Sequence, residues 1–249
     1  MDDLITSKQN PKIKEWKKLK QKKERYKTQR YLVEGEHLIE EAIQSNVTVE
    51  TIIIEESYQG HVPISSNIQI YTVTKTLFQE ISDTESPQGI AGIVVMNAEE
   101  LPAESQRILL LDRIQDPGNL GTMIRTADAA GFDAVVLGDG CVDLFNSKVI
   151  RSTQGSLFHL PFLQKSLEEI IPTLKKSGFQ VWGTALENSS PYQEATPTLP
   201  LALLLGNEGA GVSKDLLELT DHNVKIPIYG KAESLNVSIA AAILMYYVR

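Results

Sequence analysis

Residues 108–137 read ILLLDRIQDPGNLGTMIRTADAAGFDAVVL, and this stretch decides the fold. The apolar run 108–111 is typical of a buried strand, and 120–130 carry helical spacing that ends at Gly131, a favoured residue beyond a helix end. A second apolar run, 134–137, predicts the next strand. A strand, a helix and a strand in succession indicate an α/β fold with a mostly parallel sheet covered by helices.

The same pattern extends in both directions from this stretch. Downstream, periodicity predicts helices at 147–154 and 167–176, strands at 179–185, 201–205 and 224–228, and a last apolar helix at 236–248. Upstream, it predicts a basic helix, strands at 31–33, 49–54, 68–73 and 90–96, and helices at 36–44 and 75–81.

The polar stretch NAEELPAESQ, residues 97–106, interrupts the pattern between the two halves. We therefore expect a small α/β domain over 1–97, a linker over 98–106 and a second domain over 107–249.

Charge is distributed unevenly along the 249 residues. The net charge is −8, yet residues 8–30 hold eleven basic and two acidic side chains, which leaves +9 there and −17 in the rest. A net negative charge argues against a nucleic-acid partner, but a segregated basic segment favours contact with a polyanion. A solvated helix face accounts for the same charges equally well at this point.

Several classes of protein are disfavoured by composition. No apolar run reaches the length of about 18 residues that a membrane helix needs, and the N-terminus lacks the apolar core of a signal peptide. The sequence therefore predicts a cytoplasmic protein with no membrane partner. A single cysteine, Cys141, allows no internal disulfide, and four scattered histidines give no metal-ligand spacing, so we expect no metal.

Three loops follow three strand ends in the second half: DRIQDPGN (112–119), GNEGAG (206–211) and YGKAESLN (229–236). Ligands gather at the carboxyl ends of strands in an open α/β sheet. GNEGAG alone is a weak glycine motif, because most such matches are ordinary turns. It lies late in the chain and contains a carboxylate that would repel phosphate, which disfavours a nicotinamide-dependent dehydrogenase.

Taken together and in order, these loops resemble the three motifs of the SpoU (TrmH) family within the SPOUT superfamily. The matching stretches are LLLDRIQDPGNLGTMIRTADAAGFDAVVL, LLLGNEGAGVS and IPIYGKAESLNVSIAAAILMYY. YLVEGEHLIEEAI and QGIAGIV resemble more loosely the ribosomal-protein-like substrate-binding domain that precedes the catalytic domain in many members. The resemblance implies a trefoil-knotted α/β domain that uses S-adenosylmethionine to methylate a ribose 2′-hydroxyl in RNA.

The resemblance also implies the site residues. It assigns adenosine and ribose contacts, made largely by backbone groups, to Thr184, Gly206, Ile226 and Leu235. It assigns catalysis to five residues of the three motifs: Asn119, Arg125, Glu208, Ser234 and Asn236. It further implies a homodimer, for which the apolar C-terminal helix with Met245, Tyr246 and Tyr247 is a fitting surface.

The chemistry of these residues leaves alternatives open. An arginine is effectively always protonated, so Arg125 is either a strongly perturbed base or, more easily, a clamp that stabilises the developing alkoxide. Glu208 could hold Arg125 or a neighbouring amide, or only favour the following helix. Asn119, Ser234 and Asn236 could be helix caps alone.

Three functional hypotheses follow. The leading one is ribose 2′-O-methylation of a structured RNA, with ribosomal RNA favoured over transfer RNA because the N-terminal domain resembles that of rRNA-directed members. The second is a catalytically silent RNA-binding or ribosome-assembly protein. The third is a SPOUT enzyme that methylates a base nitrogen or acts on transfer RNA.

Overall fold

A computed structural model describes residues 4–45, 47–63, 67–97 and 100–249. The chain divides into two compact units, of which the first contains residues 1–98 and 143–158 and the second contains 99–142 and 159–249. The segment 143–158, which the sequence analysis assigns to the second domain, thus belongs to the first unit. Residues 98 and 99, at the start of the expected linker, lie outside the described residues.

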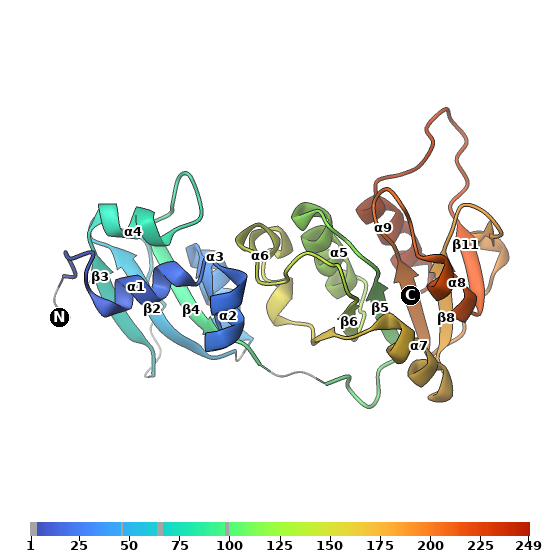
Figure 1. The fold of residues 1–249 in the computed structure, drawn as a ribbon, viewed down its shortest axis with the longest axis horizontal. Coiled ribbons are helices and arrows are strands. Elements are labelled where there is room, and N and C mark those ends of the chain that lie inside the picture. Colours follow the sequence, from blue (N-terminus) through green and yellow to red (C-terminus); the bar gives the residue numbers. More distant parts are fainter. Residues whose placement is uncertain (1–3, 46, 64–66, 98–99) are drawn as a thin grey trace. The chain divides into compact units, whose positions relative to one another are not determined.

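The first unit is built on a mixed four-stranded sheet in the order β1-β4-β2-β3. β4 runs antiparallel to β1 and β2, whereas β2 and β3 are parallel. The strands are β1 Arg30–Glu34, β2 Val49–Glu55, β3 Gln69–Val73 and β4 Ile90–Val95. The helices are α1 Pro11–Lys18, α2 Lys22–Thr28, α3 Glu36–Gln44, α4 Lys75–Ile81 and α6 Ser147–Thr153 (Figure 1).

The expected basic helix is two helices. The chain leaves the helical conformation after α1, and Gln21 is extended at the start of α2. The break is explained by packing: Ile13, Trp16 and Leu19 are buried against α4 and the sheet, which fixes α1 on the core. The basic segment is therefore part of the folded unit, with its apolar stripe inside.

The second unit is built on a seven-stranded sheet in the order β7-β6-β5-β10-β8-β11-β9, and every strand pair is parallel. The predicted parallel sheet is therefore confirmed. The strands are β5 Arg107–Leu111, β6 Ala134–Leu137, β7 Phe162–Gln164, β8 Gln180–Thr184, β9 Ser190–Pro191, β10 Leu201–Leu205 and β11 His222–Lys225. The α-helices are α5 Pro117–Ala129, α7 Leu167–Lys176, α8 Lys214–Leu219 and α9 Val237–Tyr247.

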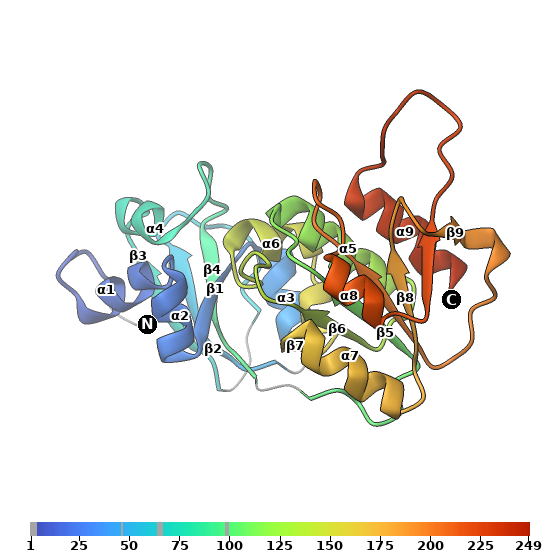
Figure 2. The same cartoon turned by 45° about the vertical axis from the view of Figure 1, so that its right-hand side comes forward.

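Helices cover this sheet on both faces. α7 and α8 pack together over one core cluster, whereas α5 and α9 pack against each other (Figure 2). Burial on both faces explains why β6 and β10 are apolar at every position. The strand expected at 224–228 is instead His222–Lys225, because the chain leaves the sheet at Ile226 and begins a long loop before α9 (Figure 1). The trefoil knot stays a prediction.

Candidate active site

Three loops lie at one edge of the second sheet. β5, β10, β8 and β11 are neighbours and parallel, so their carboxyl ends point the same way. The segments that follow β5, β10 and β11 are residues 112–116, 206–213 and 226–236, which we call the loop cluster. The sheet topology therefore brings together the three stretches that the sequence analysis singled out.

The first loop ends in the cap of α5. Asp116 is the N-cap, its carboxylate accepts a hydrogen bond from Asn119 N at 2.8 Å, and Pro117 is the first helical residue. Asn119 is thus the third residue of α5 rather than its cap, which corrects the expectation. The sequence carries the signal, because an aspartate directly before a proline is a favoured helix start. The side chain of Asn119 is consequently available for other partners.

Glu208 in the second loop holds the first loop in place. Its carboxylate accepts hydrogen bonds from Asp116 N at 3.0 Å, Gln115 N at 3.2 Å and Asn119 Nδ2 at 3.2 Å. Of the three roles considered from sequence, the structure therefore shows the contact with neighbouring amides, and it gives no contact between Glu208 and Arg125. Partial burial acts to raise the pKa of Glu208, but the backbone and amide donors outweigh it and lower that pKa below its usual value.

The third loop joins the same network through Asn236. Its Nδ2 donates to Asn119 Oδ1 at 3.0 Å, while its Oδ1 caps α9 by accepting from Ser238 N at 2.9 Å. A continuous chain of hydrogen bonds therefore runs from Glu208 through Asn119 to Asn236, with one residue from each motif. Asn236 is both a cap and a member of this network, so the two interpretations of it are compatible.

The side chains of Arg125 and Ser234 are not part of this hydrogen-bond network. Both are exposed, and no hydrogen bond or ion pair joins the side chain of either to another residue in the described part of the protein. Arg125 follows Asn119 by six positions on α5, which turns its side chain to another side of the helix. Its guanidinium keeps its hydrogen-bond donors for partners outside this set of residues.

The four expected cofactor residues lie in or beside the loops after β8, β10 and β11. Thr184 ends β8, and its hydroxyl donates to Leu204 O at 3.2 Å. Gly206 is buried, and a Cβ there would lie 2.1 Å from Val212 N, so any side chain would displace the loop itself. Ile226 is half-buried, whereas Leu235 is 37% exposed.

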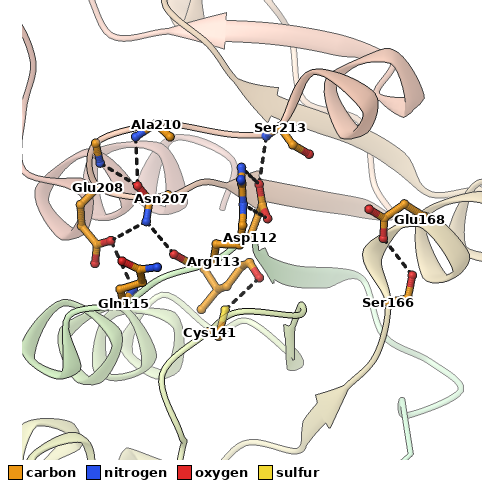
Figure 3. Close-up of polar contacts among 12 residues, drawn as sticks. Asp112, Arg113, Gln115, Cys141, Ser166, Glu168, Asn207, Glu208, Ala210 and Ser213 are labelled. Carbon is orange, nitrogen blue, oxygen red and sulfur yellow. Dashed lines mark hydrogen bonds and ion pairs between the residues drawn. The ribbon is translucent and has the colours of Figure 1, made fainter.

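Two residues that the sequence analysis did not select also shape the loop cluster. The Asp112 carboxylate is 5% exposed and accepts from Ser213 N at 2.9 Å and from the Arg113 guanidinium (Figure 3). Asn207 donates to Arg113 O and accepts from two amides of its own loop. An asparagine at the start of a glycine-rich turn is a recognisable signal for such a role.

The basic segment 8–30 contains two kinds of cation. Ion pairs join five of its side chains to acidic residues outside the segment: Lys8 and Lys17 to Glu80, Lys20 to Asp83, Arg25 to Asp143 and Arg30 to Glu50. Five exposed lysines have ammonium groups with no ion pair or hydrogen bond among the residues described, although that of Lys22 lies over the Tyr26 ring: Lys14, Lys18, Lys22, Lys23 and Lys27. Local acids thus balance about half of the positive charge.

Neither a membrane span nor a metal centre is found in the part of the chain that the structure describes. Over those ranges, no helix has the length and apolar character required to cross a bilayer. Within the same ranges, no group of three or more His, Cys, Asp or Glu side chains is placed to hold a metal ion.

Two family models match the chain in the order of its domains. The SpoU rRNA Methylase family matches residues 106–246, and the MRM3-like substrate binding domain matches residues 10–92. Among curated proteins, the chain is 51% identical over 245 residues to the 23S rRNA (guanosine(2553)-2'-O)-methyltransferase RlmP of Bacillus subtilis, covering 98% of both chains.

Solved structures share the whole architecture. An AdoMet-bound rRNA methyltransferase from Sinorhizobium meliloti is 31% identical with a TM-score of 0.87, covering 99% of this chain and 97% of that one. A structure described as an RNA 2'-O ribose methyltransferase is 33% identical with a TM-score of 0.83, covering 99% and 98%. This chain therefore belongs to the SpoU rRNA Methylase family and is an S-adenosylmethionine-dependent RNA 2′-O-ribose methyltransferase.

Proposed function

We propose that the protein transfers a methyl group to the ribose 2′-hydroxyl of a guanosine in 23S rRNA. The observation that carries the proposal is the single hydrogen-bonded chain Glu208, Asn119, Asn236, which draws one residue from each motif to one sheet edge. The 51% identity to a 23S rRNA guanosine methyltransferase, over nearly the full length, supports the choice of RNA and base. This role agrees with the cytoplasmic location expected from the sequence.

Glu208 acts in this proposal as a fixed anion rather than as a general base. Its oxygens already accept from Gln115, Asp116 and Asn119, and these donors keep its pKa low. A carboxylate of that kind is a poor proton acceptor but a good anchor for donors. Its task is to hold the first loop and the Asn119 amide in the arrangement that the substrate meets.

Arg125 carries the charge that the reaction requires. As the 2′-oxygen gains the methyl group, its hydroxyl proton passes to solvent water, and a guanidinium with uncommitted donors stabilises the negative charge that develops on that oxygen and on the adjacent phosphate. The exposed guanidinium of Arg125 has no ion pair or hydrogen bond within the described residues, which supports the role of oxyanion stabiliser because its donors are uncommitted. Ser234, exposed in the third loop, is placed beside Asn236 in sequence and completes the proposed substrate contacts.

The loop cluster, together with the end of β8 and the segment after it, offers residues suited to a bent nucleoside cofactor. Thr184, Gly206, Ile226 and Leu235 would hold S-adenosylmethionine largely through backbone groups, and when bound it supplies an electrophilic methyl group on a sulfonium. Two exposed apolar side chains, Leu186 at 66% and Leu235 at 37%, belong to loops that follow β8 and β11. Apolar side chains beside backbone donors and acceptors are the chemistry that an adenine ring needs.

We assign RNA recognition to the first domain, residues 1–97, joined by the linker 98–106 to the methyltransferase domain 107–249. The five lysines without ion pairs, two in α1 and three in α2, supply the phosphate contacts. The match of residues 10–92 to a substrate binding domain supports this assignment.

We also propose a homodimer through α9. One face of this helix is buried within the chain, while Ile239 and Tyr246 are 52% and 54% exposed and lie one above the other, seven residues apart. The surface differs from the one expected, because Met245 is fully buried and the hydroxyl of Tyr247 donates to Ala195 O. An apolar helix with a second, exposed apolar face is suited to an isologous contact.

Transfer of labelled methyl groups tests the proposal. Wild-type protein and S-adenosylmethionine should methylate unmodified 23S rRNA and leave transfer RNA unlabelled, and Arg125→Ala should strongly slow the labelling. Label in transfer RNA alone would favour the tRNA-directed alternative. Binding of 23S rRNA with no methyl transfer by a folded protein that binds the cofactor would favour a silent assembly factor.

A further inference from the structure

Asn207 lies directly before Glu208, and its side chain makes four hydrogen bonds. Its Oδ1 accepts from Gly209 N at 3.0 Å and Ala210 N at 2.9 Å. Its Nδ2 donates to Arg113 O at 2.9 Å and to Glu208 Oε2 at 3.3 Å (Figure 3). Both ends of this amide are thus fully engaged within the loop cluster.

The oxygen and the nitrogen of the Asn207 amide bind different parts of the loop cluster. The oxygen closes the turn of the second loop, which backbone hydrogen bonds between Asn207 and Gly211 also close at 2.9 and 3.1 Å. The nitrogen reaches out of that loop to the first loop and to the carboxylate of Glu208. Arg113, whose carbonyl receives this bond, has a φ of 53°, a backbone conformation that is uncommon for a non-glycine residue.

A carboxylate on a loop can rotate unless something fixes it. Glu208 is exposed, and its contacts with Gln115, Asp116 and Asn119 all come from one side, the first loop and the start of α5. Asn207 Nδ2 donates, from within Glu208's own loop, to Oε2, the oxygen that also accepts from Gln115 N. The carboxylate is therefore held between two loops, and Asn207 joins the same loops a second time through Arg113 O.

We propose that Asn207 is a positioning residue for methyl transfer: its amide nitrogen locks Glu208 against the first loop, so that Asn119 and Asn236 stay aligned. This inference rests on the proposed role of Glu208. It predicts that the donor of Asn207 matters for the reaction, whereas the acceptor matters for the fold of the loop.

The substitution Asn207→Asp separates the two functions. Aspartate keeps the oxygen that accepts from Gly209 and Ala210, loses the donor, and places a second carboxylate beside Glu208. The other charged or titratable groups around Glu208 are the carboxylate of Asp116, the Asp112–Arg113 pair and the Cys141 thiol, whose pKa burial raises to about 11. A new negative charge at 207 therefore disfavours the ionised form of Glu208.

A matched control exists in Asn146, the N-cap of α6 in the first unit. Its side chain likewise accepts from a backbone amide two residues on, Lys148 N at 2.9 Å. Asn146→Asp adds the same charge and keeps the same type of acceptor, at a residue that belongs to none of the three loops of the loop cluster. Thermal unfolding of both variants reports whether the fold is kept.

The experiment measures kcat and KM for methylation of 23S rRNA against pH, with a ¹³C NMR titration of Glu208 assigned through Glu208→Gln. We expect Asn207→Asp to lower kcat about 10- to 100-fold, with an acidic limb moved to higher pH and a raised pKa of Glu208. Asn146→Asp should match wild type in kcat, in the position of the acidic limb and in the pKa of Glu208. Equal kcat and pH profiles in the two variants would overturn the inference. Inactive wild-type protein would instead overturn the proposed function, and the titration would still decide whether Asn207 holds Glu208.

Discussion

The basic segment 8–30 and the loop cluster hold their charges in different ways. In the basic segment, acidic side chains from distant parts of the sequence neutralise five cations, and five lysines stay exposed. In the loop cluster, neutral amide donors bind the Glu208 carboxylate, and on the neighbouring α5 the guanidinium of Arg125 has no ion pair among the described residues. The first arrangement depends on charge and should respond to salt. The second arrangement depends on hydrogen-bond geometry, so it should not respond to salt.

The largest effect on stability should come from the buried pair of the first unit. The side chains of Arg25 and Asp143 are 7% and 8% exposed, so Asp143→Asn leaves a buried guanidinium without its anion. We expect a loss of about 3–5 kcal/mol in the free energy of unfolding, measured by urea titration. Glu50→Gln is the control, because Arg30 and Glu50 are about one-third exposed and their pair contributes at most about 1 kcal/mol. Equal losses in the two variants would contradict the comparison.

Next in size is the effect of Arg125 on the reaction. Arg125→Ala should lower kcat about 10²- to 10³-fold, the usual cost of losing one group that stabilises a developing oxyanion. The affinity for S-adenosylmethionine, measured by isothermal titration, should not change. Arg125→Lys keeps the charge without the planar fork and should recover part of the rate. A wild-type rate in Arg125→Ala would remove this residue from the catalytic set.

Glu208→Gln should have a smaller effect on kcat, about 10-fold, and a distinct effect on acid stability. Because the folded pKa of Glu208 is lowered, its stabilisation is complete above the usual carboxyl value of about 4.3 and is lost as the pH falls through the folded value. The variant should therefore lose less stability than wild type as the pH falls from about 5 to the acid limit. Parallel curves of unfolding free energy against pH would show that Glu208 contributes nothing through its charge.

The smallest effect concerns RNA binding by the exposed lysines. Its dependence on salt concentration tests the comparison between the basic segment and the loop cluster. A triple Lys14→Ala, Lys23→Ala, Lys27→Ala variant should bind 23S rRNA more weakly. The slope of the logarithm of its binding constant against the logarithm of salt concentration should become flatter by about one unit for each phosphate that is no longer neutralised. The control triple Lys8→Ala, Lys17→Ala, Lys20→Ala removes the same charge from side chains engaged with Glu80 and Asp83. If both triples changed the salt dependence equally, only net charge would matter.

Sequence periodicity is a reliable guide where an element is long or fully apolar. The ranges of α3, α4, β6, α7 and β10 agree with prediction to the residue. The elements that it did not predict, β7, β9 and α8, have two to six residues each, too few to show a period. The prediction of a single helix for the basic segment was wrong because its many charges masked the apolar stripe of Ile13, Trp16 and Leu19. That stripe decides how α1 packs.

The site, like the fold, has features that the sequence predicts and features that it does not. Motif order selected Asn119, Glu208 and Asn236, which the structure joins in one chain of hydrogen bonds. Their links could not be predicted, because a pairing such as that of Glu208 with Asp116 spans 92 residues and depends on strand order. Asn207 was missed because the motif GNEGAG stands out by its glycines, although an asparagine at the start of such a turn is itself a signal; its bond to Arg113 O, in another loop, is seen only in the structure.

The chemical identity of the methylated nucleoside is the most direct test of ribose methylation. Unmodified 23S rRNA would be incubated with the protein and S-adenosylmethionine, digested to nucleosides and analysed by mass spectrometry. We predict one product, 2′-O-methylguanosine, with the added mass on the ribose fragment. Added mass on the base fragment would contradict ribose methylation and, with it, the proposed roles of Arg125 and of the network around Glu208.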